Sequence, residues 1–402
     1  MSKIKIRNFG PIRDGFVDND GWMDINKVTV LIGDQGSGKS TVAKLISLFS
    51  WLEKDLFRSG GLTRRFRQQE RLLKNLLEYH RINTYVNSKT DIQYEGDAYN
   101  ISYRTGHNLD IQQILNNSYT LPKITYFPAE RNFVSSVRKL SGGQNLRLWS
   151  QSLQEFKETF QEVKESFKEK ETFHLPISNV DLEYNKLNDI LYVKGADYKI
   201  QLSDAASGFQ SYIPLFVVVN YVSGLIKSEQ EMDEQQREYF KKESAKILND
   251  KTYTEEQKRI LLSNLAAQFN IKRTINIIEE PEQNLFPASQ QKAVHHLIEC
   301  NNTVKENKLI LSTHSPYILT ALNNSILAED VFKKTGKAID RYSPEKRVAF
   351  TDVAAYQCED GRIVSIKDQD TRLIDADAID NCSAEINSDF DALLDLLPEN
   401  VD

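Results

Sequence analysis

A glycine-rich segment near the N-terminus has the residue types and spacing that hold phosphates. The sequence GDQGSGKST matches the pattern GxxxxGK[ST] at Gly33, Gly38, Lys39 and Ser40. Glycines let backbone N–H groups turn toward phosphate oxygens, and the N-terminus of a following helix adds the positive end of its dipole. In such a loop, Lys39 reaches the terminal phosphates of a nucleotide and the hydroxyl of Ser40 binds Mg²⁺.

The segments on either side of this loop predict the setting that the motif requires. The run KVTVLI at 27–32 is apolar and β-branched and predicts a strand, and TVAKLISLFSWL after it has apolar residues at helical spacing. The alternative is an ordinary solvated turn before a helix. The sequence favours a nucleotide site, and we expect the phosphates of a nucleotide and Mg²⁺ to be held by Gly33, Gly36, Gly38, Lys39, Ser40 and Thr41.

A second segment places two carboxylates at the end of an apolar run. In TINIIEEPEQNLFP, residues 275–278 predict a buried strand, and Glu279 and Glu280 follow it directly. Such a position suits a phosphate site, because one carboxylate can hold Mg²⁺ and the next can orient the attacking water. The alternative is an acidic helix cap after a strand.

A third segment ends a strand in polar residues. The run KLILSTHSPYIL predicts a strand at 309–311 that is closed by Ser312, Thr313 and His314, and Pro316 opens the next helix. A lone histidine is more often structural than functional. Here a strand that lies beside the acidic strand would allow the imidazole of His314 to contact the γ-phosphate.

The three segments, in this order, resemble the ATP-binding-cassette (ABC) ATPases of the RecF, SMC and OLD group. The opening KIKIRNFGPI and the run ITYFPAERN at 124–132 match that group too, so the resemblance covers nearly the whole chain. It implies an α/β fold, an ABC-ATPase head of the P-loop NTPase type with helical insertions. It also implies that Glu280 is the catalytic carboxylate and His314 the switch histidine. Glu279 would be the metal-side acid, where aspartate is more usual.

Members of that group close as dimers, with ATP between the phosphate loop of one copy and a signature loop of the other. The literal signature LSGGQ stands at 140–144, far before the acidic strand, and a polar helix follows it. The run LSDAASGFQSYIPL leads instead into an apolar helix. We therefore expect Ser207, Gly208 and Gln210 to serve the partner's nucleotide, and 140–144 to be a flexible loop or a regulatory contact.

The distances between the motifs divide the chain into a head and its insertions. Residues 1–57 carry the phosphate loop, and 58–120 are an insertion that is helical and then β. Residues 121–227 hold the signature and a short helical seam, 228–270 form a charged helical insertion, and 271–402 carry the acidic strand, the switch histidine and an acidic tail.

The composition of the chain limits how it could bind nucleic acid and where in the cell it is expected. The chain has 402 residues and a net charge of −6, so nucleic acid would need a local patch such as the arginine-rich stretch 58–74. A solvated helix face is the alternative there. The three cysteines are far apart and predict reduced thiols. With no apolar leader and no run of membrane-spanning length, the expected location is the cytoplasm.

The resemblance also suggests a biological role. Small OLD-like ATPases of this length are similar to the ATPase subunits of bacterial anti-phage systems such as PARIS and Septu. This implies a homodimer or higher homo-oligomer, a separately encoded effector nuclease and a phage-derived trigger protein as partners. Two alternatives stay open: a RecF-like DNA-repair ATPase that binds DNA directly, and a nucleotide-bound scaffold that does not hydrolyse ATP.

Overall fold

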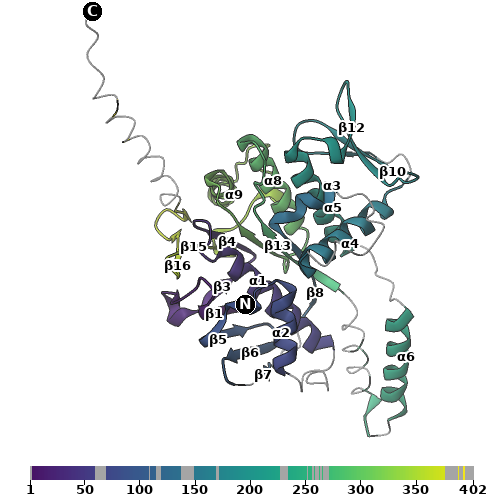
Figure 1. The fold of residues 1–402 in the computed structure, drawn as a ribbon, viewed down its shortest axis with the longest axis vertical. Helices are drawn as coiled ribbons and strands as arrows, with labels where there is room; N and C mark the ends of the chain where they lie inside the picture. The colour runs from purple at the N-terminus through teal and green to yellow at the C-terminus, as the bar shows by residue number, and fades with distance from the viewer. Residues whose placement is uncertain are drawn as a thin grey trace, which may run out of the picture.

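A central sheet organises the chain in the computed structural model (Figure 1). The structure describes residues 2–58, 69–107, 109–114, 119–136, 149–168, 172–226, 234–250, 252–255 and 271–375, and the single positions 258, 262, 265, 388 and 393. In this part of the chain the sheet has seven strands in the order β2-β16-β15-β4-β14-β13-β8. Their bounds are β2 Gly15–Phe16, β4 Val28–Ile32, β8 Leu121–Phe127, β13 Ile271–Glu279, β14 Lys308–Ser312, β15 Val353–Glu359 and β16 Arg362–Ser365.

Five neighbouring strands of this sheet, β8, β13, β14, β4 and β15, run parallel. Strand β16 pairs antiparallel with β15. Strands β4 and β13 are rich in isoleucine and valine and are almost completely buried, as expected for parallel strands covered on both faces. A second, two-stranded pair follows near the end of the described chain, formed by β17 (Lys367–Asp368) and β18 (Leu373–Ile374).

One face of the central sheet is covered by helix α1 (Lys39–Arg58). Its residues Val42, Leu45 and Phe49 share a core with alternate residues of the central strands and with a second, antiparallel sheet. That sheet has the order β3-β1-β5-β6-β7, with bounds β1 Ser2–Phe9, β3 Met23–Ile25, β5 Val86–Glu95, β6 Tyr99–Arg104 and β7 Asp110–Gln113. Helix α1 is therefore packed between the two sheets.

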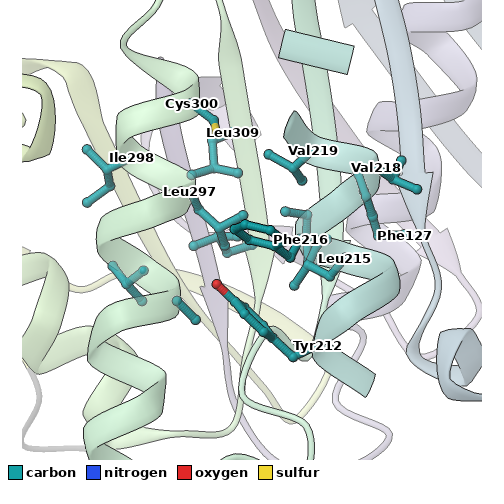
Figure 2. Close-up of a cluster of buried hydrophobic side chains, with 14 of the residues drawn as sticks. Phe127, Tyr212, Leu215, Phe216, Val218, Val219, Leu297, Ile298, Cys300 and Leu309 are labelled. Atoms are coloured by element: carbon teal, nitrogen blue, oxygen red, sulfur yellow. The ribbon is translucent and has the colours of Figure 1, made fainter. Parts of the chain in front are cut away.

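The other face carries helices α4 (Gln151–Ser166), α5 (Ser207–Leu225), α8 (Pro287–Asn301) and α9 (Pro316–Thr335). In Figure 2, Leu215 and Phe216 of α5 meet Leu297 of α8, with Phe127 of β8 close by. Burial of residues 211–219 explains why the middle of α5 is mostly apolar, and it confirms the apolar helix expected after LSDAASGFQSYIPL. Within the described ranges, no helix is both long and apolar enough to span a bilayer.

Further helices and strands lie between the segments that carry the motifs. Helix α2 (Gln69–Tyr79) precedes β5–β7, and α6 (Glu234–Asn249) lies in the charged insertion. The predicted helical seam is α4, whose apolar residues are buried in the core of the head. A four-stranded antiparallel sheet between α4 and α5 was not predicted, because its short strands alternate weakly. It consists of β9 Thr172–His174, β10 Asp181–Asn185, β11 Ile190–Lys194 and β12 Lys199–Gln201.

The α/β class predicted from the sequence is confirmed, with the phosphate loop between β4 and α1 and with helical segments inserted into the head. Several expectations concern residues outside the described ranges. These are the run LSGGQ at 140–144, most of the arginine-rich stretch 58–74 and most of the acidic tail after residue 375.

Candidate active site

Three polar loops leave the central sheet at the same edge. Leu31 of β4 pairs with Ser312 of β14, and Ser312 pairs with Glu279 of β13. Because these strands are parallel neighbours in register, the phosphate loop, the two glutamates and the segment ending in His314 lie together at their carboxyl ends. Ligands of open α/β sheets bind at this edge.

The glycines of the phosphate loop adopt backbone conformations that other residues rarely take. Gly33, Gly36 and Gly38 have φ values of 136°, 76° and 112°. A Cβ at Gly33 would stand 2.1 Å from the carbonyl oxygen of Cys358, and one at Gly38 would stand 2.3 Å from Cδ1 of Ile12. The close approach of β15 and of the N-terminal segment therefore requires glycine at both ends of the loop.

Lys39 points back into this loop. Its Nζ donates hydrogen bonds to the carbonyl oxygens of Gly33 and Asp34, each at 2.7 Å, and only 5% of the residue is exposed. Burial lowers the pKa of Lys39, and the Cys358 thiol and the Asp34 and Glu280 carboxylates oppose that shift.

Other groups in the loop also fit a phosphate ligand. The hydroxyl of Ser37 is buried and has no hydrogen-bond partner. Lys39, Ser40 and Thr41 open helix α1, so their N–H groups have no acceptor inside that helix. An inward-facing ammonium, an unpaired hydroxyl and free helix N–H groups together suit the oxygens of a nucleotide triphosphate.

Glu280 and His314 face each other beside this loop. The Oε1 atom of Glu280 lies 3.9 Å from Nε2 of His314, with the side chains 38% and 30% exposed. The N–H of Glu280 donates to the carbonyl oxygen of Ser312 at 2.8 Å. The Glu280 carboxylate also acts electrostatically on Lys39, so the structure brings these three predicted residues together. A partly exposed carboxylate at this position is able to hold a water molecule.

Glu279 lies deeper than Glu280 and already has protein partners. Its Oε1 accepts a hydrogen bond from the Tyr126 hydroxyl and lies 4.0 Å from Nζ of Lys44. Burial raises the pKa of Glu279, and Lys44 counters that shift. The Glu279 carboxylate and the Ser40 hydroxyl supply the oxygen donors that Mg²⁺ prefers, so they are the residues that would hold the ion.

The signature candidate lies at the start of α5. Ser207 is exposed, and a Cβ at Gly208 would stand 2.7 Å from the carbonyl oxygen of Asn284, which belongs to the loop after Glu280. Gln210 is occupied within the chain, because its Nε2 donates to the carbonyl oxygens of Ser203 and Ala205, each at 2.9 Å. Gln210 therefore shapes the turn before α5, while Ser207 is presented to the surface.

Four further residues belong to the site, although the sequence did not predict a role for them: Glu282, Arg131, Lys44 and Tyr126. Glu282 accepts the backbone N–H of His314 at 2.8 Å, and burial raises its pKa. Arg131 is completely buried, which lowers its pKa to about 10 and still leaves it protonated at neutral pH. Both residues stand in motifs quoted above. Lys44 follows Ser40 by one helical turn, a detectable signal, whereas nothing in the sequence distinguishes Tyr126.

A parallel α/β sheet with a glycine loop, a buried lysine and two strand-end glutamates defines a P-loop ATPase. The chain belongs to the AAA ATPase domain family, whose sequence model matches residues 1–272. No curated protein matches the chain in a sequence comparison. The protein is therefore an ATPase by family, while the roles of individual residues are proposals.

Solved structures that match this chain include heads and cassettes of other ATPases. The SMC head domain from Thermotoga maritima is 11% identical, with 90% of this chain and 97% of that chain covered and a TM-score of 0.33. An SMC head bound to the C-terminal winged-helix domain of ScpA is 11% identical, with coverages of 92% and 98% and a TM-score of 0.41. A dimeric bacterial ABC transporter cassette is 11% identical, with coverages of 90% and 96% and a TM-score of 0.24.

Proposed function

We propose that this chain is an ABC-type ATPase that closes as a homodimer around ATP and Mg²⁺. The observation that carries the proposal is where one chain places the phosphate loop and the signature candidate. The phosphate loop opens α1 on one face of the central sheet, and Ser207 and Gly208 open α5 on the other. Since Ser207 is exposed, a second copy can bring its own Ser207 and Gly208 to the phosphates held by Lys39.

Each side chain at the edge has a role in this scheme. Lys39 neutralises charge on the transferred phosphoryl group, and the partner's α5 N-terminus adds N–H donors to it. Glu280 orients the attacking water and accepts its proton, and His314 contacts the γ-phosphate. When bound, Mg²⁺ neutralises phosphate charge, and Ser40 and Glu279 would hold it.

Exposed aromatic side chains next to this edge support self-association. Phe286, the residue directly before α8, is 76% exposed, and Tyr317, three residues after His314, is 51% exposed. Phe133, which lines a cavity together with Glu279, is 53% exposed. Large apolar groups around a polar site are typical of a surface that another protein covers.

The biological role we propose is that of a cytoplasmic sensor or scaffold subunit in a bacterial anti-phage complex. ATP-driven closure would control a separately encoded effector nuclease, and a phage-derived protein would be the trigger. The support for this role is the resemblance of the three motifs, in order, to the RecF, SMC and OLD group, together with a chain length like that of the OLD-like ATPase subunits of such systems.

Co-purification from the native operon tests this role. We expect a nuclease to copurify with the wild-type protein, and we expect Lys39→Ala to abolish protection of cells against phage while the folded assembly persists. Full protection by Lys39→Ala would contradict the proposal. ATPase activity that DNA stimulates and salt suppresses steeply would favour the DNA-repair alternative instead. Unchanged function in Glu280→Gln would favour the scaffold that does not hydrolyse ATP.

A further inference from the structure

The buried residue Arg131 joins two parts of the site that the proposed reaction uses. It lies in the 3₁₀ turn Ala129–Asn132, directly after β8. Its Nη1 donates to the carbonyl oxygen of Glu279 and its Nη2 to that of Glu280, each at 2.6 Å. Its Nε donates to the carbonyl oxygen of Ser211, near the start of α5, at 3.1 Å. One guanidinium therefore holds the end of β13 and the beginning of α5.

The backbone at Glu280 turns in a way that makes this contact possible. In an extended strand, the carbonyl groups of successive residues point to opposite sides, so one side chain cannot donate hydrogen bonds to both. Glu280 has a φ of 44°, in the left-handed region that residues with side chains rarely occupy. Its N–H is held by Ser312 of β14 and its carbonyl by Arg131. These two contacts fix the direction in which the Glu280 carboxylate leaves the backbone.

Only a guanidinium can make this set of contacts. Arginine carries five donors in a rigid plane, whereas lysine carries three donors on a single nitrogen. In the described part of the chain, the hydrogen-bond partners of Arg131 are backbone carbonyls, including Pro128 at 3.3 Å, and no carboxylate forms an ion pair with it. The hydrogen bonds of Arg131 therefore fix backbone geometry, while the Glu279, Glu280 and Glu282 carboxylates act on its charge only through space.

The start of α5 is held to the same loop by further contacts. The Oγ of Ser211, a fully buried residue, accepts a hydrogen bond from Nδ2 of Asn284 at 2.9 Å. Gly208 packs against the carbonyl of Asn284. Beyond this point α5 is rigidly packed, since Tyr212, the next residue, lies in the core drawn in Figure 2. A displacement at Glu280 is thus transmitted to the N-terminus of α5.

We infer that Arg131 is a positioning residue that couples Glu280 to the Ser207–Gly208 turn of the same chain. The inference rests on the proposed function, in which Glu280 serves the chain's own nucleotide and the turn serves the partner's. Through Arg131, each chain links the two nucleotide sites of the dimer. Its loss should slow hydrolysis and weaken ATP-dependent dimerisation, without weakening the binding of ATP to the phosphate loop.

The test compares arginine-to-lysine replacements at two buried positions, one within β13 and one that packs against the end of that strand. Arg131→Lys keeps the charge and removes the planar fork. Arg273→Lys is the matched control, because Arg273 lies at the opposite end of β13, is 6% exposed and donates to the Thr120 carbonyl and the Asp97 carboxylate. For each variant we measure kcat, the equilibrium Kd for ATP and the melting temperature. ATP-dependent self-association is measured separately, with Glu280→Gln added to each variant.

For Arg131→Lys we expect kcat to fall by about tenfold or more while the Kd for ATP stays within about threefold of wild type. Self-association with ATP should weaken as well. Arg273→Lys should retain the kcat and the self-association of the wild type. Wild-type values of both in Arg131→Lys would overturn the inference. Equal losses in the two variants, in step with melting temperature, would also overturn it, because they would show a role in folding only.

A milder variant keeps the inference testable if Arg131→Lys does not fold. Ser211→Ala removes the acceptor for Asn284 and leaves the contacts of Arg131 in place. We expect kcat to fall by about two- to threefold at unchanged Kd, and an unchanged kcat would count against coupling through α5. The proposed function has tests of its own. It is contradicted if the wild-type protein does not dimerise with ATP or if Lys39→Ala still binds ATP normally.

Discussion

At the scale of single residues, the site depends on two strand-end glutamates with different surroundings. Glu279 is buried among Tyr126 and Lys44, whereas the side chain of Glu280 is 38% exposed beside His314. A buried carboxylate with fixed partners suits a metal-side role, and an accessible one suits contact with water. The sequence placed both residues at the strand end, and their different environments explain the division of labour that we propose.

Replacing the accessible carboxylate should stop hydrolysis and spare binding. In Glu280→Gln, kcat should fall by about a hundredfold or more, because a general base typically contributes that much. The Kd for ATP should stay near the wild-type value, since Lys39 and its loop are untouched. Single-turnover hydrolysis and equilibrium binding measure the two quantities, with Glu279→Gln as a comparison. A wild-type kcat in Glu280→Gln would remove Glu280 from the mechanism.

A buried histidine should make the folded protein sensitive to acid. His80 is 3% exposed, its Nδ1 has no partner, and burial lowers its pKa to about 3 from an ordinary value of 6.5, with Lys44 adding to the shift. Below pH 6.5 the unfolded chain therefore binds a proton that the folded chain does not. The stability that neutral His80 contributes is present above pH 6.5 and is lost progressively as the pH falls toward 3.

His80→Phe removes this titration and keeps an aromatic ring. Between pH 8 and pH 5, the wild type should lose about 2 kcal/mol more unfolding free energy than the variant, from the proton uptake of one group. Urea unfolding at the two pH values measures the difference. Equal losses in both proteins would show that His80 does not stay neutral in the folded state.

At the scale of elements, the sequence predicted the strands and helices that carry the motifs. Apolar runs before Gly33, Glu279 and Ser312 became β4, β13 and β14, because buried parallel strands need a mostly apolar sequence. Pro316 begins α9 as expected. These local signals were sufficient to place the phosphate loop and the acidic strand at one edge.

Contacts between distant segments could not be predicted in the same way. The four carbonyls that Arg131 contacts come from three separate segments of the chain, and the close approach of Gly208 to Asn284 depends on the packing of α5. The sheet β9–β12 has short strands with a weak alternating pattern. In each case tertiary packing, rather than local propensity, determines the outcome.

Two arginine substitutions distinguish the two signature candidates. Ser207→Arg places a bulky charged side chain at the N-terminus of α5, and we expect it to reduce ATPase activity by about tenfold or more by blocking the partner's phosphates. Ser141→Arg, in the LSGGQ run, should stay active. Both variants should bind ATP normally, as measured with a fluorescent analogue. An inactive Ser141→Arg together with an active Ser207→Arg would reverse the assignment.

At the scale of the whole molecule, the proposed dimer forms only if two copies meet at the edge that carries Glu280. The aromatic side chain of Phe286 is largely exposed on this surface. Phe286→Glu should weaken ATP-dependent dimerisation by about tenfold or more, because a charge in the centre of an interface must be desolvated. Its Kd for ATP as a monomer should not change.

The matched control for this surface is Leu187→Glu. Leu187 is 95% exposed on the turn between β10 and β11, in the outer sheet. Analytical ultracentrifugation with and without ATP measures both variants. Unimpaired dimerisation of Phe286→Glu, or an equal defect in Leu187→Glu, would mean that the two copies meet elsewhere.

The central claim is that one nucleotide touches two copies of this chain, and a photocrosslinking experiment tests it most directly. A tagged Lys39→Ala protein, which does not hold ATP in its own loop, is mixed with untagged wild type and an ATP analogue that crosslinks from the γ-phosphate. We predict labelling of the tagged chain at residues 207–210 in the mixture and no labelling of the tagged chain alone. Labelling confined to the untagged wild-type chain would contradict the account, because the phosphate would then contact residues of a single copy.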